Sequence, residues 1–221
     1  MTCRLKGTLM FNFKFKSLTV SLALLAAVPL AMAQAPANPT LRLRATIEKI
    51  DATSLTVKAR SGEVITLVRP ATMDVAEVFP LALADIKPGS YIGTAAMPQA
   101  DGSQLALEVV VFPESARGTG EGHRPYDLLP DSTMTNATVA DLAMAPSTVP
   151  GGQKLTLRYK DGEKTVIVPP NAPVVSFKPA KADENVLLVP GAKVMVTAQE
   201  RDGKPTALRV IVGRNGFAPP M

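Results

Sequence analysis

The chain has 221 residues, a formal net charge of +5, one cysteine, one histidine and no tryptophan. The cysteine and four of the positive charges lie in the first 33 residues, so residues 34–221 are cysteine-free and nearly neutral. This composition excludes disulfides, thiol catalysis and cysteine-ligated metals in that part of the chain. It also removes net charge as an argument for nucleic-acid binding.

Residues 1–33 have the layout of a secretory signal peptide. Basic residues without any acid precede the apolar run Leu18–Leu30, and the small residues Ala31 and Ala33 follow it. The run is shorter than the roughly 20 residues of a membrane-spanning helix, which favours cleavage over an uncleaved anchor. We expect cleavage after Ala33 and an exported, periplasmic protein without a transmembrane segment in its mature chain.

The rest of the chain is duplicated. The segment SLTVKARSGEVITLV in the first half corresponds to KLTLRYKDGEKTVIV in the second. Three glycines recur at an offset of about 100 residues: Gly62, Gly89 and Gly102 match Gly162, Gly191 and Gly203. We predict a tail at 34–39, a first domain at 40–116, an ordered strap at 117–134, a second domain at 135–213 and a C-terminal tail at 214–221.

Each copy is predicted to contain five short strands. Apolar and polar residues alternate from Leu41 to Ile47, which indicates a half-buried strand, and the phase slips at Ile50, which indicates a bulge or the strand end. Hairpin turns are predicted at Ser61–Gly62, Asp101–Gly102, Asp161–Gly162 and Asp202–Gly203. Residues 69–89 are interpreted as an irregular crossover containing one helical turn.

This pattern predicts an all-β protein of two tandem five-stranded OB-like barrels, although a meander sandwich would give a similar pattern. Several aromatic residues fall at expected core positions and residues 34–221 have almost no net charge, so the basic stacking groove of a nucleic-acid binder is not expected. Arg42, Arg44, Lys58 and Arg60 share strand faces in the first copy. They either form a basic patch or are simply the solvated face of a sheet.

The strap has no counterpart inside either copy and holds the densest group of polar residues. Glu121, His123, Arg124, Tyr126 and Asp127 are the candidate binding residues. Its large polar and apolar side chains indicate an ordered connection rather than a passive tether. Such a connection holds the two domains together and can also line a crevice between them, where ligands commonly bind.

Metal binding and catalysis are weaker hypotheses for the strap. His123 with Glu121 and Asp127 would supply few ligands for a transition metal, so no metal site or cofactor is predicted. His123 and Asp127 with Ser132 or Thr133 resemble a triad by residue type, but the chain contains no nucleophile elbow of the G-x-S-x-G type. No catalytic residue is therefore predicted.

Two stretches carry a resemblance to a known group of proteins. RATIEKIDATSLTVKARSGEVITL and the segment from Leu83 to Glu114 resemble exported bacterial β-proteins with OB-like domains of unknown function. The joining segment ARGTGEGHRPYDLLPDSTMTNATV resembles a subset in which the domain is doubled. Members of this subset sometimes bear the name "metal ABC transporter permease", which a chain without several spanning helices does not support. The resemblance implies fold and export, but no reaction or ligand.

Together these observations predict a non-catalytic periplasmic module that binds an envelope protein or a small ligand. One alternative is a metal-binding or metal-responsive envelope protein that uses His123 and nearby carboxylates. A second alternative is a small-ligand binder whose site is the crevice between the two domains.

Overall fold

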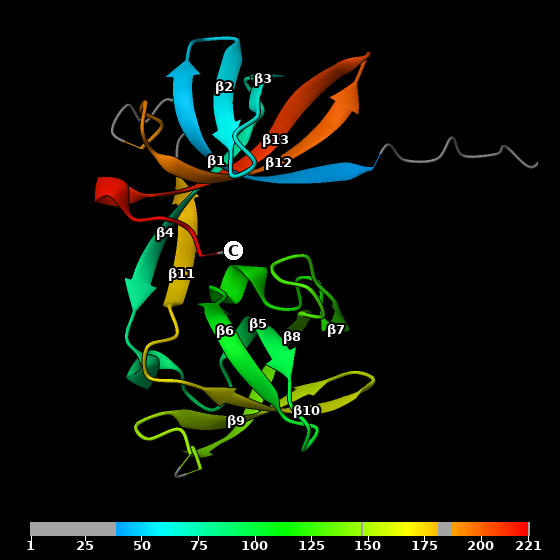
Figure 1. Ribbon diagram of the computed structural model, residues 1–221, viewed down its shortest axis with the longest axis vertical. Coiled ribbons are helices and arrows are strands. Elements are labelled where there is room, and N and C mark those ends of the chain that lie inside the picture. The colour runs from blue at the N-terminus through cyan, green and yellow to red at the C-terminus, as the bar shows by residue number, and fades with distance from the viewer. Residues whose placement is uncertain (1–38, 147, 181–186, 221) are drawn as a thin grey trace, which may run out of the picture. The chain divides into compact units, whose positions relative to one another are not determined.

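A computed structural model describes residues 39–146, 148–180 and 187–220 (Figure 1). The predicted leader and most of the tail at 34–39 lie outside these residues. The described chain is all-β and contains only short 3-10 turns besides its strands. None of the described residues forms a helix that is long and apolar enough to cross a membrane.

The duplication is visible in the order of the strands. The first copy contributes β1 (Thr40–Ile50), β2 (Ser54–Ala59), β3 (Val64–Val68), β4 (Asp74–Leu81), β5 (Tyr91–Pro98) and β6 (Gln104–Val111). The second contributes β8 (Thr133–Met144), β9 (Gln153–Tyr159), β10 (Gly162–Val168), β11 (Val174–Ala180), β12 (Lys193–Arg201) and β13 (Lys204–Gly213). Between them lies the short strand β7 (Gly122–Pro125), and the 3-10 turns are η1 (Leu83–Asp85), η2 (Glu114–Ala116) and η3 (Arg214–Gly216).

Several local predictions are confirmed. The register of β1 against β2 shifts between Ile47 and Lys49, and β1 ends at Ile50. Gly62 follows β2 with a positive φ of 91°, and Asp202 and Gly203 join β12 to β13 with φ of 51° and 70°. Positive φ at both central residues produces the twist that joins two antiparallel strands closely.

The prediction of five strands per copy is wrong, because each crossover contains a sixth strand. β4 lies within residues 69–89, the predicted irregular crossover, and β11 occupies the equivalent place in the second copy. Pro80 lies in β4 and Pro179 lies in β11. Proline donates no hydrogen bond and normally argues against a strand, which hides both elements from a reading of periodicity. The expected helical turn is present as η1.

Strand pairing also corrects the expectation that each copy pairs its own strands. β1, β2 and β3 of the first copy pair in sequence, but β1 then pairs with β12 and β3 pairs with β13 of the second copy. Because β12 and β13 form a hairpin, these five strands close a ring of pairings, which we call ring one. In Figure 1 the blue and cyan strands of ring one lie beside its orange strands.

Ring two is built in the same way from the other halves. β8, β9 and β10 of the second copy pair in sequence, β8 also pairs with β5, and β10 pairs in parallel with β6. The hairpin of β5 and β6 completes the ring. The two predicted domains, 40–116 and 135–213, therefore exchange their last two strands.

The crossover strands explain this exchange. β4 is an extended run of eight residues, which spans about 26 Å and carries the chain from ring one to ring two. β4 and β11 pair antiparallel with Val78 opposite Phe177, and each pairs in parallel with a hairpin strand, β13 or β6. This register relates the two copies by a pseudo-two-fold axis near Val78 and Phe177.

Both copies are needed to fill each core. In ring one, Leu55 and Val57 of the first copy pack in one cluster with Val196 and Val210 of the second, all fully buried. A similar cluster fills ring two. A third cluster, which includes Val78, lies at the crossover strands between the rings. Burial of each such side chain stabilises the fold by about 1.5–3 kcal/mol. Without the strands of the other copy, each core would lose these contributions.

Candidate functional site

The strap contacts ring two through its first half. β7 pairs antiparallel with β8, and His123 lies opposite Thr135. Nδ1 of His123 is 2.8 Å from Oγ1 of Thr135. The backbone N–H of Lys160 donates a hydrogen bond of 3.0 Å to a carboxylate oxygen of Glu121. Glu121 and His123 therefore belong to the surface of ring two.

The second half of the strap contacts ring one. The guanidinium carbons of Arg42 and Arg44 lie 5.6 and 5.8 Å from the centroid of the Tyr126 ring. Nη2 of Arg44 donates a hydrogen bond of 3.2 Å to Asp127. Burial, reinforced by the nearby carboxyl of Glu108, raises the pKa of Tyr126, so its phenol is neutral at physiological pH. The five predicted residues are thus divided between the two rings.

Two observations bear on the metal and triad hypotheses for the strap. No three His, Cys, Asp or Glu side chains in the described parts of the chain lie close enough to hold a metal ion. Burial, with a smaller contribution from Lys164, lowers the pKa of His123. Oγ of Ser132 lies 2.7 Å from the carbonyl oxygen of Leu129, in the turn that precedes β8. The hydroxyl of Ser132 is thus used in building the turn.

A cavity of about 440 Å³ opens where the strap, β11 and both rings meet. We call it the central pocket. Its lining combines residues from all of these elements: Arg42, Gly93, Val110, Phe112, Pro113, Ser115, Ala116, Thr119, Gly120, Arg124, Tyr126, Met134, Asn136, Phe177, Pro179, Met195, Thr197, Arg209 and Ile211. Among the five predicted binding residues, Arg124 and Tyr126 line it.

Aromatic and sulfur-containing side chains form much of the pocket wall. The rings of Phe112 and Phe177 meet edge to face with centroids 5.6 Å apart. Met134 of β8 and Met195 of β12 line the same cavity. Methionine side chains are flexible and polarisable, so they adapt to apolar ligands of different shape.

The charged residues of the lining are all arginines. Arg209 lies with its guanidinium carbon 5.3 Å from the centroid of Phe177, and Nη1 of Arg124 donates a hydrogen bond of 2.8 Å to the carbonyl of Gly120. Arg42 lies over Tyr126. No carboxylate lines the pocket, and within the described residues none of these three arginines forms an ion pair. Their guanidinium groups remain available to an anion.

Asn136 and Gly93 shape one end of the pocket. Nδ2 of Asn136 donates a hydrogen bond of 2.9 Å to the carbonyl of Thr119, while its buried Oδ1 has no protein partner among the described residues. A Cβ atom at Gly93 would lie 2.7 Å from that oxygen and 2.9 Å from the Phe112 ring. Glycine is therefore required for this close approach, and Oδ1 can accept a hydrogen bond from a ligand.

Sequence reasoning misses most of this pocket because its residues come from strands that are distant in the chain. The register makes Gly93 equivalent to Met195, and Val110 equivalent to Ile211, across the pseudo-two-fold axis. The duplication was visible in the sequence, but the exchange that brings these equivalent positions together was not.

Comparison with protein-family models, with characterised proteins and with solved structures finds no match for this chain. The kind of ligand that fits the central pocket is therefore inferred only from the residues that line it.

Proposed function

We propose that this protein is a non-catalytic binding module, and that the central pocket takes a small ligand with an apolar body and an anionic head. The observation that carries the proposal is the pocket itself, an apolar cavity between the two rings whose charged lining residues are all arginines. This corresponds to the crevice hypothesis of the sequence analysis.

The size and chemistry of the pocket support this ligand class. Its volume of about 440 Å³ lies in the range typical of small-molecule sites, which are mainly apolar with a few placed polar groups. Phe112, Phe177 and Met195 would contact the apolar body of the ligand. Guanidinium groups bind carboxylates and phosphates through paired hydrogen bonds, so Arg42, Arg124 and Arg209 would bind its head.

The cellular setting remains part of the proposal. The layout of residues 1–33 supports export, and the periplasm of a Gram-negative bacterium is the corresponding compartment. We further propose that each ring is a small barrel of the OB type. Three consecutive antiparallel strands, closed by a hairpin that pairs with the first strand and in parallel with the third, support this interpretation.

The test is calorimetric titration with octanoate, using 1-octanol as a neutral probe of similar length. We expect octanoate to bind and octanol to bind at least about tenfold more weakly, since only octanoate has a head for the arginines. Arg209→Met should weaken octanoate binding at least about fivefold. Arg158→Met, at an exposed arginine outside the pocket, is the control and should leave binding unchanged.

A second variant tests whether octanoate binds in the central pocket. Ser115 is exposed and lines the pocket, so Ser115→Trp should fill the cavity without disturbing a core. Ser61→Trp, in the turn after β2, is its control. Equal binding of octanol and octanoate, or unchanged binding by the Ser115→Trp protein, would contradict the proposal.

A further inference from the structure

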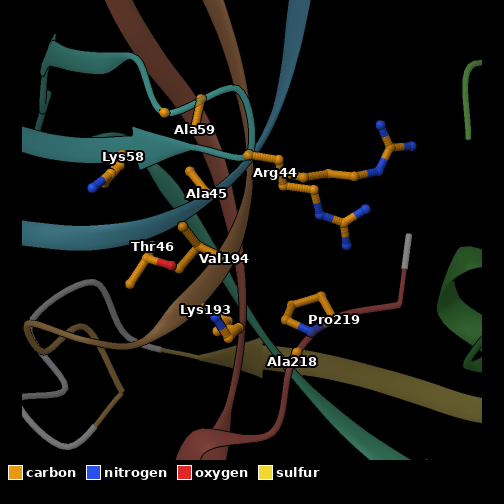
Figure 2. A pocket seen from close by; sticks show the side chains of 11 residues that line it. Arg44, Ala45, Thr46, Lys58, Ala59, Lys193, Val194, Ala218 and Pro219 are labelled. Atoms are coloured by element: carbon orange, nitrogen blue, oxygen red, sulfur yellow. The ribbon is translucent and has the colours of Figure 1, made fainter.

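A second cavity, of about 300 Å³, lies on the outer face of ring one. We call it the basic pocket. Thr46 of β1 pairs with Lys58 of β2 on one side and with Lys193 of β12 on the other. Figure 2 shows Thr46 between these two lysines, with Pro219 of the C-terminal tail beyond Lys193. Cationic side chains from the strands on both sides of β1 therefore lie on this surface of the sheet.

The basic pocket carries four cationic side chains and no lining carboxylate: Arg44, Lys58, Arg60 and Lys193. Arg44 is partly neutralised, because Asp127 pairs with it. Within the described residues, Lys58, Arg60 and Lys193 have no ion pair. Nε of Arg44 is buried and has no hydrogen-bond partner there. The pocket therefore favours an anionic occupant.

On ring two the equivalent face is covered by the strap. The registers make Lys193 equivalent to Tyr91, and Arg44 equivalent to Asn136. The hydroxyl of Tyr91 and Nδ2 of Asn136 both donate hydrogen bonds to the carbonyl of Thr119, at 3.2 and 2.9 Å. The backbone N–H of Lys160, the equivalent of Arg60, donates to Glu121. A peptide segment with an acidic side chain thus fills this place on ring two.

The strand edge beside this face also differs between the two rings. After Glu121 the strap continues as β7, which pairs with Thr133–Asn136 of β8. The equivalent residues of β1, 41–44, pair with β12 on one side. On the other side the carbonyl of Arg44 accepts a 3.0 Å hydrogen bond from the backbone N–H of Arg60, and the described structure places no strand beside residues 41–43. An unpaired edge accepts an added strand through its backbone hydrogen bonds.

We propose that the basic pocket and the 41–43 edge of β1 dock an extended acidic peptide segment of a partner protein. The segment takes the place on ring one that residues 119–125 take on ring two. A carboxylate of the segment meets Arg60 and Lys58, its backbone carbonyls meet Arg44 and Lys193, and its next residues pair with β1. No aromatic side chain lines the basic pocket, which favours a peptide over a single-stranded nucleic acid.

The probe is a fluorescein-labelled peptide, Gly-Glu-Thr-Glu-Val-Thr-Val-Gly, titrated with the full chain and followed by fluorescence anisotropy at about 50 mM salt, where screening is modest. We expect a dissociation constant on the order of 100 μM, weakened at least about tenfold when glutamine replaces both glutamates. N-methylation of alternate valine and threonine amides, which removes the donors of an added strand, should also weaken binding.

Matched double variants locate the contact. Lys58→Ser with Arg60→Ser should weaken binding of the acidic peptide at least about tenfold. Arg158→Ser with Lys160→Ser changes the equivalent positions on ring two, where the strap already lies, and should leave binding within about twofold. A Ser115→Trp protein separates this site from the central pocket and should bind the peptide normally.

Four outcomes would overturn the proposal. The glutamine peptide binds as tightly as the acidic one, or N-methylation has no effect. Inorganic phosphate at about 1 mM displaces the peptide completely, which indicates a small-anion site. A fluorescein-labelled oligothymidylate of eight nucleotides binds more tightly and loses affinity in the Lys58→Ser, Arg60→Ser protein, which indicates a nucleic-acid surface.

Discussion

Ring one and ring two share their strand order and even their irregularities, but their outer faces differ. Register shifts follow Ala95 in β5 and Thr197 in β12, at equivalent positions. The strap covers one face of ring two. The equivalent face of ring one holds the basic pocket. The duplicated strands therefore determine the architecture, while the segments that follow β6 and β13 decide which face can bind.

The buried acids break the symmetry as well. Glu108 in β6 is equivalent to Arg209 in β13, and Glu77 in β4 is equivalent to Ser176 in β11. Glu77 is paired with Arg214, while Glu108 has an oxygen without a partner among the described residues. The two buried acids, each without an acidic counterpart in the other copy, thus have opposite consequences for stability.

The largest expected effect comes from separating the copies. Residues 39–116 alone contain β1–β3 without the hairpin of β12 and β13, so we expect no cooperatively folded monomer. Residues 117–220 alone should likewise fail to fold, and an equimolar mixture should recover strand content. Circular dichroism with urea titration measures both. A folded, cooperatively unfolding monomer of residues 39–116 would show that the strand exchange is not required.

Glu77→Ala should have the next largest effect. Glu77 is 5% exposed and accepts hydrogen bonds of 2.9 and 2.8 Å from Arg214. Loss of these charge-assisted hydrogen bonds, whose donor stays partly exposed, should lower the free energy of unfolding by about 1.5–3 kcal/mol. The exposed pair of Arg158 and Glu163 is the control, and Glu163→Ala should cost less than about 0.5 kcal/mol. Urea titration compares the two variants.

The ion pair of Glu77 also predicts how the stability of the Glu77→Ala protein depends on pH. Hydrogen bonds from Arg214 hold the pKa of Glu77 below its ordinary value. The contribution of Glu77 is therefore present above the unfolded pKa and is lost as pH falls through the lower folded pKa. The difference between wild type and Glu77→Ala should shrink in acid, and a constant difference would contradict the ion-pair explanation.

Glu108→Gln should have a smaller effect of opposite sign. Burial raises the pKa of Glu108 to about 7, and the charges of Arg44 and Arg60 offset this only in part. The folded state then holds the proton more tightly than the unfolded state. The contribution of Glu108 to stability is present below pH 4.5 and is lost as pH rises from about 4.5 to about 7.

Replacing the carboxyl of Glu108 by an amide removes this pH-dependent loss of stability. Glu108→Gln should raise the free energy of unfolding by about 1–2 kcal/mol near pH 8 and flatten its dependence between pH 4.5 and 7. Urea titration across this range measures both effects, with Glu163→Gln as the exposed control. A Glu108→Gln protein less stable than wild type near pH 8 would show that the charged carboxylate is stabilised by Arg44.

The sequence correctly predicts features that depend only on neighbouring residues in the chain. The turn at Asp202–Gly203 needs positive φ at two residues, and the bulge near Ile50 appears directly as a break in alternation. The five candidate residues of the predicted strap do not form one site. Arg124 and Tyr126 line the central pocket, while Glu121 and His123 contact ring two.

The duplication, the all-β class and most strand positions can be predicted from the amino-acid sequence, because alternation and turn residues act within a few positions along the chain. Which copy each hairpin joins depends on the tertiary structure. Equivalent strands of the two copies offer similar backbone edges and apolar faces, so strand patterning does not distinguish pairing within a copy from exchange. The extended course of β4 and β11 makes that choice by carrying each hairpin to the other ring, and the central pocket follows from it.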